Sequence, residues 1–176
     1  MPSLSTLLIL TENSNVAERA VVNASPLIFL SRAGLIDLLQ LISAEIVAPE
    51  IVASEIGVRG PSDPTAQVIA STSWLLVTQT PQVPSQIQAW GLGRGESSVL
   101  AWAYANQGSV AILDDLAARR CAATLNVSVR GTLGLALIAK QRGRIASARR
   151  ALEHLRRGGM YLSDRVMNEA LARVGE

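Results

Sequence analysis

The chain has 176 residues, enough for one domain with a sizeable core, and none of its apolar runs approaches the roughly 18 to 20 residues of a membrane span. Aromatic residues make up only 3 %, which indicates a core of Ala, Leu, Ile and Val, and the lone Cys121 and His154 exclude an internal disulfide and argue against zinc sites and histidine-centred hydrolysis. The net charge of +2 divides into −6 for residues 1–116 (4 Arg, 10 acids) and +8 for residues 117–176 (12 bases, 4 acids). This division fits a surface that binds a cation at one place and a polyanion beside it, or a set of solvated helix faces.

The first half of the chain predicts alternating strands and helices after an N-terminal extension. Residues 1–18 show no clear period, so we expect a partly disordered extension there and a single domain over 19–176. The apolar stretch near the N-terminus is too short for a signal sequence, so we expect a cytoplasmic protein. The predicted elements are a strand at 20–23, two helices within 25–42 broken near Gly34, a strand at 45–48, a helix at 49–57, a helix at 65–73 and a strand at 74–79.

The second half continues this alternation after a long irregular stretch at 80–95. The predicted elements are a helix at 96–108, a strand at 109–113, a helix at 116–125, a strand at 127–130 and helices at 131–143, 147–157 and 162–174. Strands that alternate with helices pair in parallel and are covered on both faces. We therefore expect a three-layer α/β/α fold with a central, mainly parallel sheet of about five strands.

Polar side chains stand where predicted strands end, or one to two turns into the helix that follows. These positions are Asn23 with Ser25, Glu55, Glu96, and Asp114 with Asp115. The carboxyl ends of neighbouring parallel strands meet at one edge of a sheet, so side chains from these distant positions can share one pocket. The alternative for the first pair is that Ser25 only caps a helix and Asn23 only turns the chain.

Carboxylates gathered in this way need a physical reason, because two of them about 5 Å apart repel by roughly 3 kcal/mol at an effective dielectric of 20. A divalent cation or a shared proton usually offsets this cost. Oxygen ligands without histidine or cysteine suit Mg²⁺ or Mn²⁺. The sequence therefore predicts metal-assisted attack of water on a phosphodiester.

Four motifs carry a resemblance to a known family. The segments VVNASPLI, IVAPEIVASEI, GLGRGESSVLAWA and AILDDLAARR, in this order, resemble those of PIN domains, and the similarity runs from about Val21 to the C-terminus. More narrowly, they resemble the uncharacterised branch related to the VapC toxins, whose first strand ends in Asn-x-Ser-Pro-Leu-Ile. The resemblance implies a PIN-like fold and a metal-dependent endoribonuclease, the toxin of a toxin–antitoxin pair.

The resemblance also implies roles for individual residues. Ser25 matches a small hydroxyl residue that orients the first acid or a metal-bound water. Glu55 matches the second family acid and Glu96 the third, while Asp114 and Asp115 both fit the fourth. The metal ligands would then be Glu55, Glu96 and one of the two aspartates.

Asn23 departs from the pattern, because active PIN ribonucleases usually carry aspartate at that position. Its amide oxygen can coordinate a cation but is neutral, so metal affinity should fall. A second hypothesis is therefore a nucleic-acid-binding or regulatory protein with weak or no turnover. A third is a structural subunit whose apolar helices serve self-association, as a homodimer or larger homo-oligomer.

Four arginines are candidates for binding RNA. Arg119 and Arg120 follow the aspartate pair within two turns and could bind phosphate, although Arg119 could equally pair with one of the acids. Arg149 and Arg156 lie seven residues apart, on one side of a predicted helix, where they would guide RNA to the acids or form a solvated face. The expected partners are RNA and an antitoxin protein.

Overall fold

The structure is a computed structural model that describes residues 17–176, so the extension expected at 1–18 lies outside the described residues except for its last two. The backbone N–H of Ala17 donates to the carbonyl of Ile42 over 2.8 Å, and the Ser43 hydroxyl donates to the carbonyl of Glu18 over 3.1 Å. These two bonds attach the start of the described chain to the loop that precedes the second strand.

The centre of the fold is a five-stranded sheet in which every pairing is parallel, in the order β3-β2-β1-β4-β5. The strands are β1 (Ala20–Val22), β2 (Ile46–Pro49), β3 (Leu75–Thr78), β4 (Val110–Ile112) and β5 (Ser128–Arg130). In β1, Val21 lies opposite Val47 of β2 on one side and Ala111 of β4 on the other. The expected parallel sheet of about five strands is confirmed, with β1 in the middle.

The central strand is apolar throughout because both faces of the sheet are covered. Ala20, Val21 and Val22 have no exposed surface, so β1 shows a continuous apolar run in place of the alternation of a half-exposed strand. At the carboxyl end of β1 the chain turns into a helix. The next strand, β2, pairs on one side of β1 and the later strand β4 on the other, so the strand order reverses here. Such a point of reversal in strand order is where open α/β sheets form their sites.

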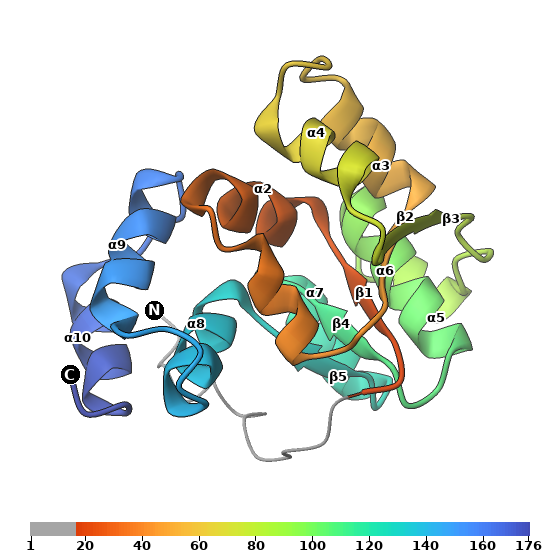
Figure 1. Ribbon diagram of the computed structural model, residues 1–176. Helices are drawn as coiled ribbons and strands as arrows, with labels where there is room; N and C mark the ends of the chain where they lie inside the picture. The colour runs from red at the N-terminus through yellow and green to blue at the C-terminus, as the bar shows by residue number, and fades with distance from the viewer. Residues whose placement is uncertain (1–16) are drawn as a thin grey trace.

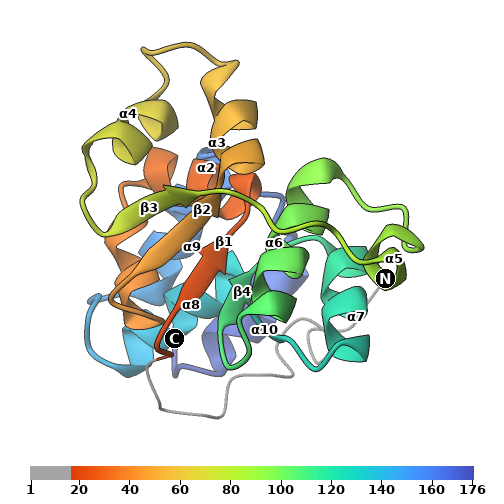
Figure 2. The ribbon, with the colours of Figure 1, turned by 90° about the vertical axis from the view of Figure 1, so that its right-hand side faces the viewer.

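Helices cover both faces of the sheet, which gives the expected three-layer α/β/α architecture (Figures 1 and 2). One face carries α2 (Ala24–Ala33), the 3-10 helix η1 (Ile36–Leu41), α8 (Thr132–Gln141), α9 (Ala148–Arg157) and α10 (Asp164–Ala172). The other face carries α5 (Ser85–Gln88), α6 (Arg94–Ala105) and α7 (Leu116–Thr124), while α3 (Glu50–Gly57) and α4 (Pro64–Ser71) pack together near β2 and β3.

The helices on the α2 face are arranged by burial. In α8 every residue from Thr132 to Ala139 is buried, so this helix lies inside the layer. In α9 the buried residues Ala148, Ala151, Leu152 and Leu155 recur at helical spacing, and the intervening positions are rich in arginine. Helix α9 therefore packs with one face and leaves a basic face toward solvent.

Two elements differ from the sequence-based prediction. The helix expected after Gly34 is a 3-10 helix, although Gly34 does end α2, in the left-handed conformation (φ +68°) that favours glycine. The stretch expected to be irregular at 80–95 contains the four-residue helix α5, which begins directly after Pro84 and is too short for a periodic signal. Among residues 17–176, none of the helices is both long and apolar enough to cross a bilayer.

Candidate functional site

Asn23 occupies the N-cap position of α2, directly after the central strand, but its side chain does not cap the helix. Asparagine is among the best N-cap residues, because its side-chain oxygen normally accepts from a backbone N–H of the first turn. Here the Nδ2 group donates instead to Oε1 of Glu96 over 3.0 Å, 73 positions later in the chain. Asn23 therefore does more than turn the chain, because its side chain links β1 to α6, and Ser25, the second residue of α2, is not the N-cap residue.

The other end of the Asn23 amide is an acceptor without a donor. Asn23 is only 3 % exposed, and its Oδ1 accepts no hydrogen bond from the residues that the structure describes. Beside it lies Gly95: a Cβ at that position would come within 2.8 Å of Asn23 Oδ1 and 3.0 Å of Glu55 Oε2. The two oxygens therefore lie no further apart than the sum of these distances.

Gly93 and Gly95 provide the space that these side chains occupy. Glu96 lies in the first turn of α6, where a carboxylate is favoured by the helix dipole, and its Oε2 lies so close to Gly93 that a side chain there would clash with it. Gly95 is buried and faces Asn23 and Glu55. Gly93 and Gly95 of the GLGRGE segment therefore leave room for the side chains of Glu96, Asn23 and Glu55.

Asp114 follows β4 and is held by the residue that follows β5 and Gly131. The backbone N–H of Thr132 donates to Oδ1 of Asp114 over 2.8 Å, and the Thr132 hydroxyl donates to Oδ2 over 2.7 Å. Thr132 has no exposed surface. Both carboxylate oxygens of Asp114 are thus fixed in position by one buried threonine.

Arg119, one turn into α7, lies beside the same carboxylate. Both Arg119 and Asp114 approach Gly131 so closely that a side chain at this glycine would contact them. Burial raises the pKa of the Asp114 carboxyl, and the Thr132 bonds and the positive charge of Arg119 offset part of that rise. This position fits the pairing of Arg119 with an acid, while phosphate binding, the other role considered, stays a prediction.

Asp115 has a structural role that Asp114 lacks. Its Oδ1 accepts from the backbone N–H of Ala118 over 2.8 Å, which makes it the N-cap of α7. Asp115 is exposed, whereas Asp114 is half-buried. The structure thus gives the two neighbouring aspartates different environments, and the choice of a ligand between them stays a prediction.

A pocket of about 520 Å³ joins most of the predicted site residues. Its polar wall contains Ser25, Glu96, Asp114, Asp115 and Arg119. Glu55 lines a different opening of about 340 Å³, together with Glu50 and Arg94. The oxygens around Gly95 therefore lie between two openings, with Glu96 toward one and Glu55 toward the other.

The predicted acids form two groups and do not converge on one point. Asn23, Glu55 and Glu96 gather around Gly95, while Asp114 is bound to Thr132. Within residues 17–176, no three carboxylate, imidazole or thiolate side chains come together closely enough to hold a metal ion. The assignment of Glu55, Glu96 and an aspartate as metal ligands stays a prediction, and the closest oxygen donors to Glu55 and Glu96 include the amide of Asn23.

The predicted RNA-binding arginines lie in different places. Arg119 lines the 520 Å³ pocket, whereas Arg120 is exposed elsewhere on α7. Arg149 is exposed in the first turn of α9. Arg156 donates to Asp164 over 2.8 Å and to the carbonyl of Leu162 over 3.3 Å, so its guanidinium holds α9 against the start of α10.

A parallel five-stranded sheet, with Asn23 and Asp114 after its central strands, fits the PIN-like fold that the four sequence motifs implied. The family model that matches residues 19–176 describes a PIN domain, named DUF3368. The chain belongs to this family. No curated protein and no solved structure is similar enough to the chain to count as a match. The PIN-domain assignment rests on the family model and the fold, while the narrower VapC-like branch stays a prediction.

PIN domains generally use divalent metals, and the residues present in this one fit a hard cation in their chemistry. The candidate donors are all oxygens: the unpaired Oδ1 of Asn23 and the carboxylates of Glu55 and Glu96. A buried acceptor that receives no hydrogen bond from residues 17–176 and lies near a carboxylate is an arrangement that a bound cation would complete.

Sequence reasoning missed two contributors to the site of this PIN domain. Thr132 stands just after a predicted strand, so the rule that selected Asn23 and Asp114 could have selected it as well. Gly95 could have been found as well, because it stands directly before Glu96 at the start of a predicted helix, where a glycine often has a packing or functional reason. The apolar residues between α9 and α10 that line the same pocket carried no signal of this kind.

Proposed function

We propose that this PIN domain is a metal-dependent endoribonuclease whose site is formed by Asn23, Glu55, Glu96 and Asp114. The observation that supports it best is the environment of Asn23. A capping residue is diverted from its helix, fixes Glu96 through its nitrogen and leaves a buried oxygen facing Glu55. An unpaired buried acceptor of this kind costs about 1 to 3 kcal/mol, which is acceptable where a ligand completes it.

Mg²⁺ or Mn²⁺ would be held by the oxygens of Asn23, Glu55 and Glu96, with Asp114 or Asp115 as the further acid. When bound, such an ion polarises a phosphoryl oxygen and lowers the pKa of water. The residues of the chain supply the rest of the site. Asn23 orients Glu96 by its hydrogen bond, and Ser25 places a hydroxyl on the wall of the 520 Å³ pocket that Glu96 also lines.

Asp114 and Arg119 provide a second polar group in this pocket. Thr132 holds Asp114 in one orientation, and the charge of Arg119 lies beside it. Arg119 lines this pocket beside Asp114, so its positive charge lies where a phosphate would enter. We assign Arg119 to phosphate binding on this basis, and Arg120 to a lesser role on the exposed surface of α7.

The cellular role that we propose is the toxin of a toxin–antitoxin pair, of the VapC-like type, acting on RNA in the cytoplasm. The antitoxin would be a small protein encoded beside it, and a homodimer or larger homo-oligomer is the expected assembly. Expression of the protein alone should arrest growth, and co-expression of the adjacent reading frame should relieve the arrest. Growth that is unaffected by the protein alone would contradict the toxin role.

A specific observation favours a second function, RNA binding with weak or no turnover. The Asn23 amide carries no charge, and its nitrogen occupies one oxygen of Glu96. The site therefore has one charge fewer than a site with aspartate at this position, and its cation affinity is lower. In this case the protein would bind RNA through the same pocket and leave it intact.

The test is cleavage of a labelled single-stranded RNA by the purified protein with Mn²⁺, with Mg²⁺ and with EDTA. We expect metal-dependent cleavage that Glu96→Gln abolishes, and weaker Mn²⁺ binding to that variant in calorimetry. Glu45→Gln is the matched control, because Glu45 lies at the opposite end of β2 and forms only a long contact of 3.9 Å with Arg19. RNA binding without cleavage at any metal concentration would support the second function.

A further inference from the structure

Helix α2 carries three different chemistries along one face. Ser25, Phe29 and Arg32 are spaced at i, i+4 and i+7, so they lie in one row. Ser25 and Phe29 both line the 520 Å³ pocket, and Arg32 lines a neighbouring pocket of about 530 Å³. At 1.5 Å per residue the row extends about 10 Å from the acidic site.

Part of the lining of the 520 Å³ pocket is apolar. It is formed by Phe29 of α2 and by the segment between α9 and α10, where Met160 and Leu162 face the pocket. Tyr161, at its rim, is 85 % exposed, which is unusual for an aromatic residue in a chain with so few of them. Apolar side chains in the same pocket as the acids and Arg119 suit a group that is both aromatic and attached to a phosphate.

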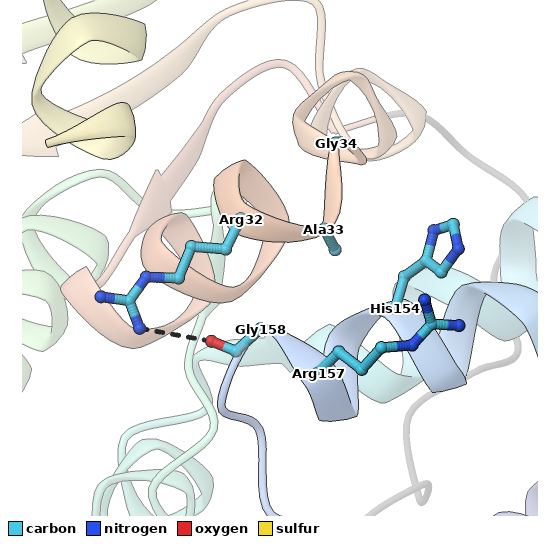
Figure 3. Close-up of a pocket in the computed structure, with 6 residues that line it drawn as sticks. All are labelled: Arg32, Ala33, Gly34, His154, Arg157 and Gly158. Atoms are coloured by element: carbon cyan, nitrogen blue, oxygen red, sulfur yellow. Dashed lines mark hydrogen bonds between the residues drawn. The ribbon is translucent and has the colours of Figure 1, made fainter.

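The 530 Å³ pocket is basic and lies between the ends of α2 and α9. Arg32, His154, Arg157 and Gly158 line it. Figure 3 shows the Arg32 guanidinium at the carbonyl of Gly158, to which it donates over 3.4 Å, and the side chains of His154 and Arg157 on the other side. The Arg157 side chain is 72 % exposed, and its only ion pair among residues 17–176 is a long 3.9 Å contact with Glu153, so most of its donors face solvent.

The segment Gly158–Gly159 joins the two pockets. A Cβ at Gly158 would meet Arg32, and one at Gly159 would lie 3.7 Å from the Arg32 guanidinium and 4.0 Å from the Phe29 ring. Gly159 adopts φ +106°, which residues with side chains rarely adopt. Gly158 thus leaves room for the Arg32 side chain, whose guanidinium donates to the Gly158 carbonyl, and Gly159 provides the positive φ that the chain adopts before Met160.

We propose that single-stranded RNA runs from the acidic site across this surface, with one base against Phe29 and Tyr161 and the following phosphates at Arg32 and Arg157. The proposal rests on the proposed nuclease function for the position of the first phosphate. The alternation of acid site, aromatic wall and arginines matches the alternation of phosphate and base in a single strand. This path differs from the one expected along Arg149 and Arg156: Arg156 is paired with the carboxylate of Asp164, whereas Arg32 makes a long 3.4 Å bond to a neutral carbonyl.

The first test measures how RNA affinity depends on salt, by fluorescence anisotropy of a labelled single strand in EDTA, where metal-dependent cleavage is prevented. Each phosphate contact contributes about 0.7 to the slope of log affinity against log salt for a single strand. Arg157→Ala should flatten the slope by about 0.7, and Arg157→Ala with Arg32→Gln by about 1.4. Arg144→Ala, an exposed change in the loop between α8 and α9, is the matched control and should leave the slope close to that of the unchanged protein.

The second test concerns the base. Tyr161→Ala should weaken RNA binding roughly tenfold through loss of stacking, while Tyr161→Phe, which keeps the ring, should bind like the unchanged protein. An oligonucleotide that lacks the base proposed to stack on Tyr161 should bind the Tyr161→Ala variant and the unchanged protein equally. Tyr161 is exposed, so neither variant should alter the melting temperature, which checks the fold.

The outcomes separate this proposal from the nuclease function. Weaker binding by the Arg157 and Tyr161 variants supports the path even if no RNA is cleaved. Unchanged affinity and salt slope in these variants would overturn the path, even if the protein cleaves RNA with Mn²⁺. A salt slope that falls only in Arg149→Ala would place the RNA on the outer face of α9, and a change of oligomeric state in Tyr161→Ala, with RNA affinity unchanged, would assign Tyr161 to contact between two copies of the chain.

Discussion

Asn23 Nδ2 donates to Glu96 Oε1 over 3.0 Å, and this single bond connects the end of the central strand to the first turn of α6. A carboxylate at position 23 could not make it. In a site with two acids this close, the oxygens would repel by roughly 5 kcal/mol at an effective dielectric of 20 unless a cation or proton stood between them. Asparagine therefore allows the metal-free site to be ordered, at the cost of one negative charge.

Replacing Asn23 with aspartate should reverse this balance. Asn23→Asp should lower the melting temperature of the metal-free protein, because the bond to Glu96 becomes a repulsion, and Mn²⁺ should raise it by more than in the unchanged protein. Calorimetry should show tighter Mn²⁺ binding, and RNA cleavage should rise. Tighter metal binding without cleavage would favour the RNA-binding function, and unchanged metal binding would remove residue 23 from the site.

The space at Gly95 gives a second prediction. Alanine normally stabilises a helix relative to glycine by roughly 0.5 to 1 kcal/mol, but a Cβ here would lie 2.8 Å from the buried Asn23 oxygen, which cannot move without breaking its bond to Glu96. Gly95→Ala should therefore weaken Mn²⁺ binding severalfold. Gly57→Ala in α3 is the control, because no atom lies within 4 Å of the added Cβ. Equal Mn²⁺ affinity for both variants would show that the approach of Asn23 and Glu55 is not needed.

The fold was predictable because the strands are apolar runs bounded by polar residues and glycines. β1 and β4 are each three residues long, yet both precede a polar side chain that the sequence analysis selected, Asn23 and Asp114. The strand ends meet at one edge, as the rule for parallel sheets predicts. The positions of the side chains within that edge were not predictable, because the Asn23 amide bonds to Glu96 and the Asp114 carboxylate accepts from Thr132.

The arginines of α9 show that the spacing of residues in the sequence does not predict their ion-pair partners. Arg149 and Arg156 do share a helix side, but the turn between α9 and α10 brings Asp164 to Arg156. That contact depends on a loop whose conformation is set by packing, not by local periodicity. Among the described acids, the closest partner of the adjacent Arg157 is Glu153, at 3.9 Å.

Thr132 should be important for the position of Asp114. Thr132→Val keeps the shape and the backbone bond but removes the hydroxyl that donates to Oδ2, and a bond to a charged group contributes about 2 kcal/mol. Denaturant unfolding at pH 7 should show a loss of about that size. Thr124→Val is the control, because the Thr124 hydroxyl bonds only to the carbonyl of Cys121 on an exposed part of α7.

This loss should depend on pH in a defined direction. The pKa of Asp114 is already raised by burial, so its ionised form opposes folding and stability rises as pH falls through that pKa. Removal of the Thr132 hydroxyl raises the pKa further. The difference between Thr132→Val and the unchanged protein should therefore shrink in acid. A difference that stays constant between pH 7 and pH 4 would mean that the hydroxyl does not bind the ionised carboxylate.

Glu176 gives the opposite pH dependence. Its carboxylate accepts from the backbone N–H groups of Arg149 and Ala148 and from Lys140 Nζ at 2.9 Å, so it holds the start of α9 against the end of α8. The bond to the Arg149 N–H is the first cause that lowers the pKa of Glu176 to about 2, from 4.5. A lowered pKa means that the stabilisation is complete above about pH 4.5 and is lost as pH falls toward 2.

Glu176→Gln should therefore lower the denaturant midpoint at pH 7, because the amide cannot replace a carboxylate that faces Lys140 and two backbone donors. The gap between the two proteins should narrow as pH falls from about 4.5 toward 2, where the unchanged protein loses the same charge. Glu169→Gln is a matched control, since Glu169 pairs with Arg165 one turn away on the surface of α10, where such pairs contribute little. A midpoint gap for Glu176→Gln that is independent of pH would show that its charge does not hold α9, and that any loss arises from the changed shape alone.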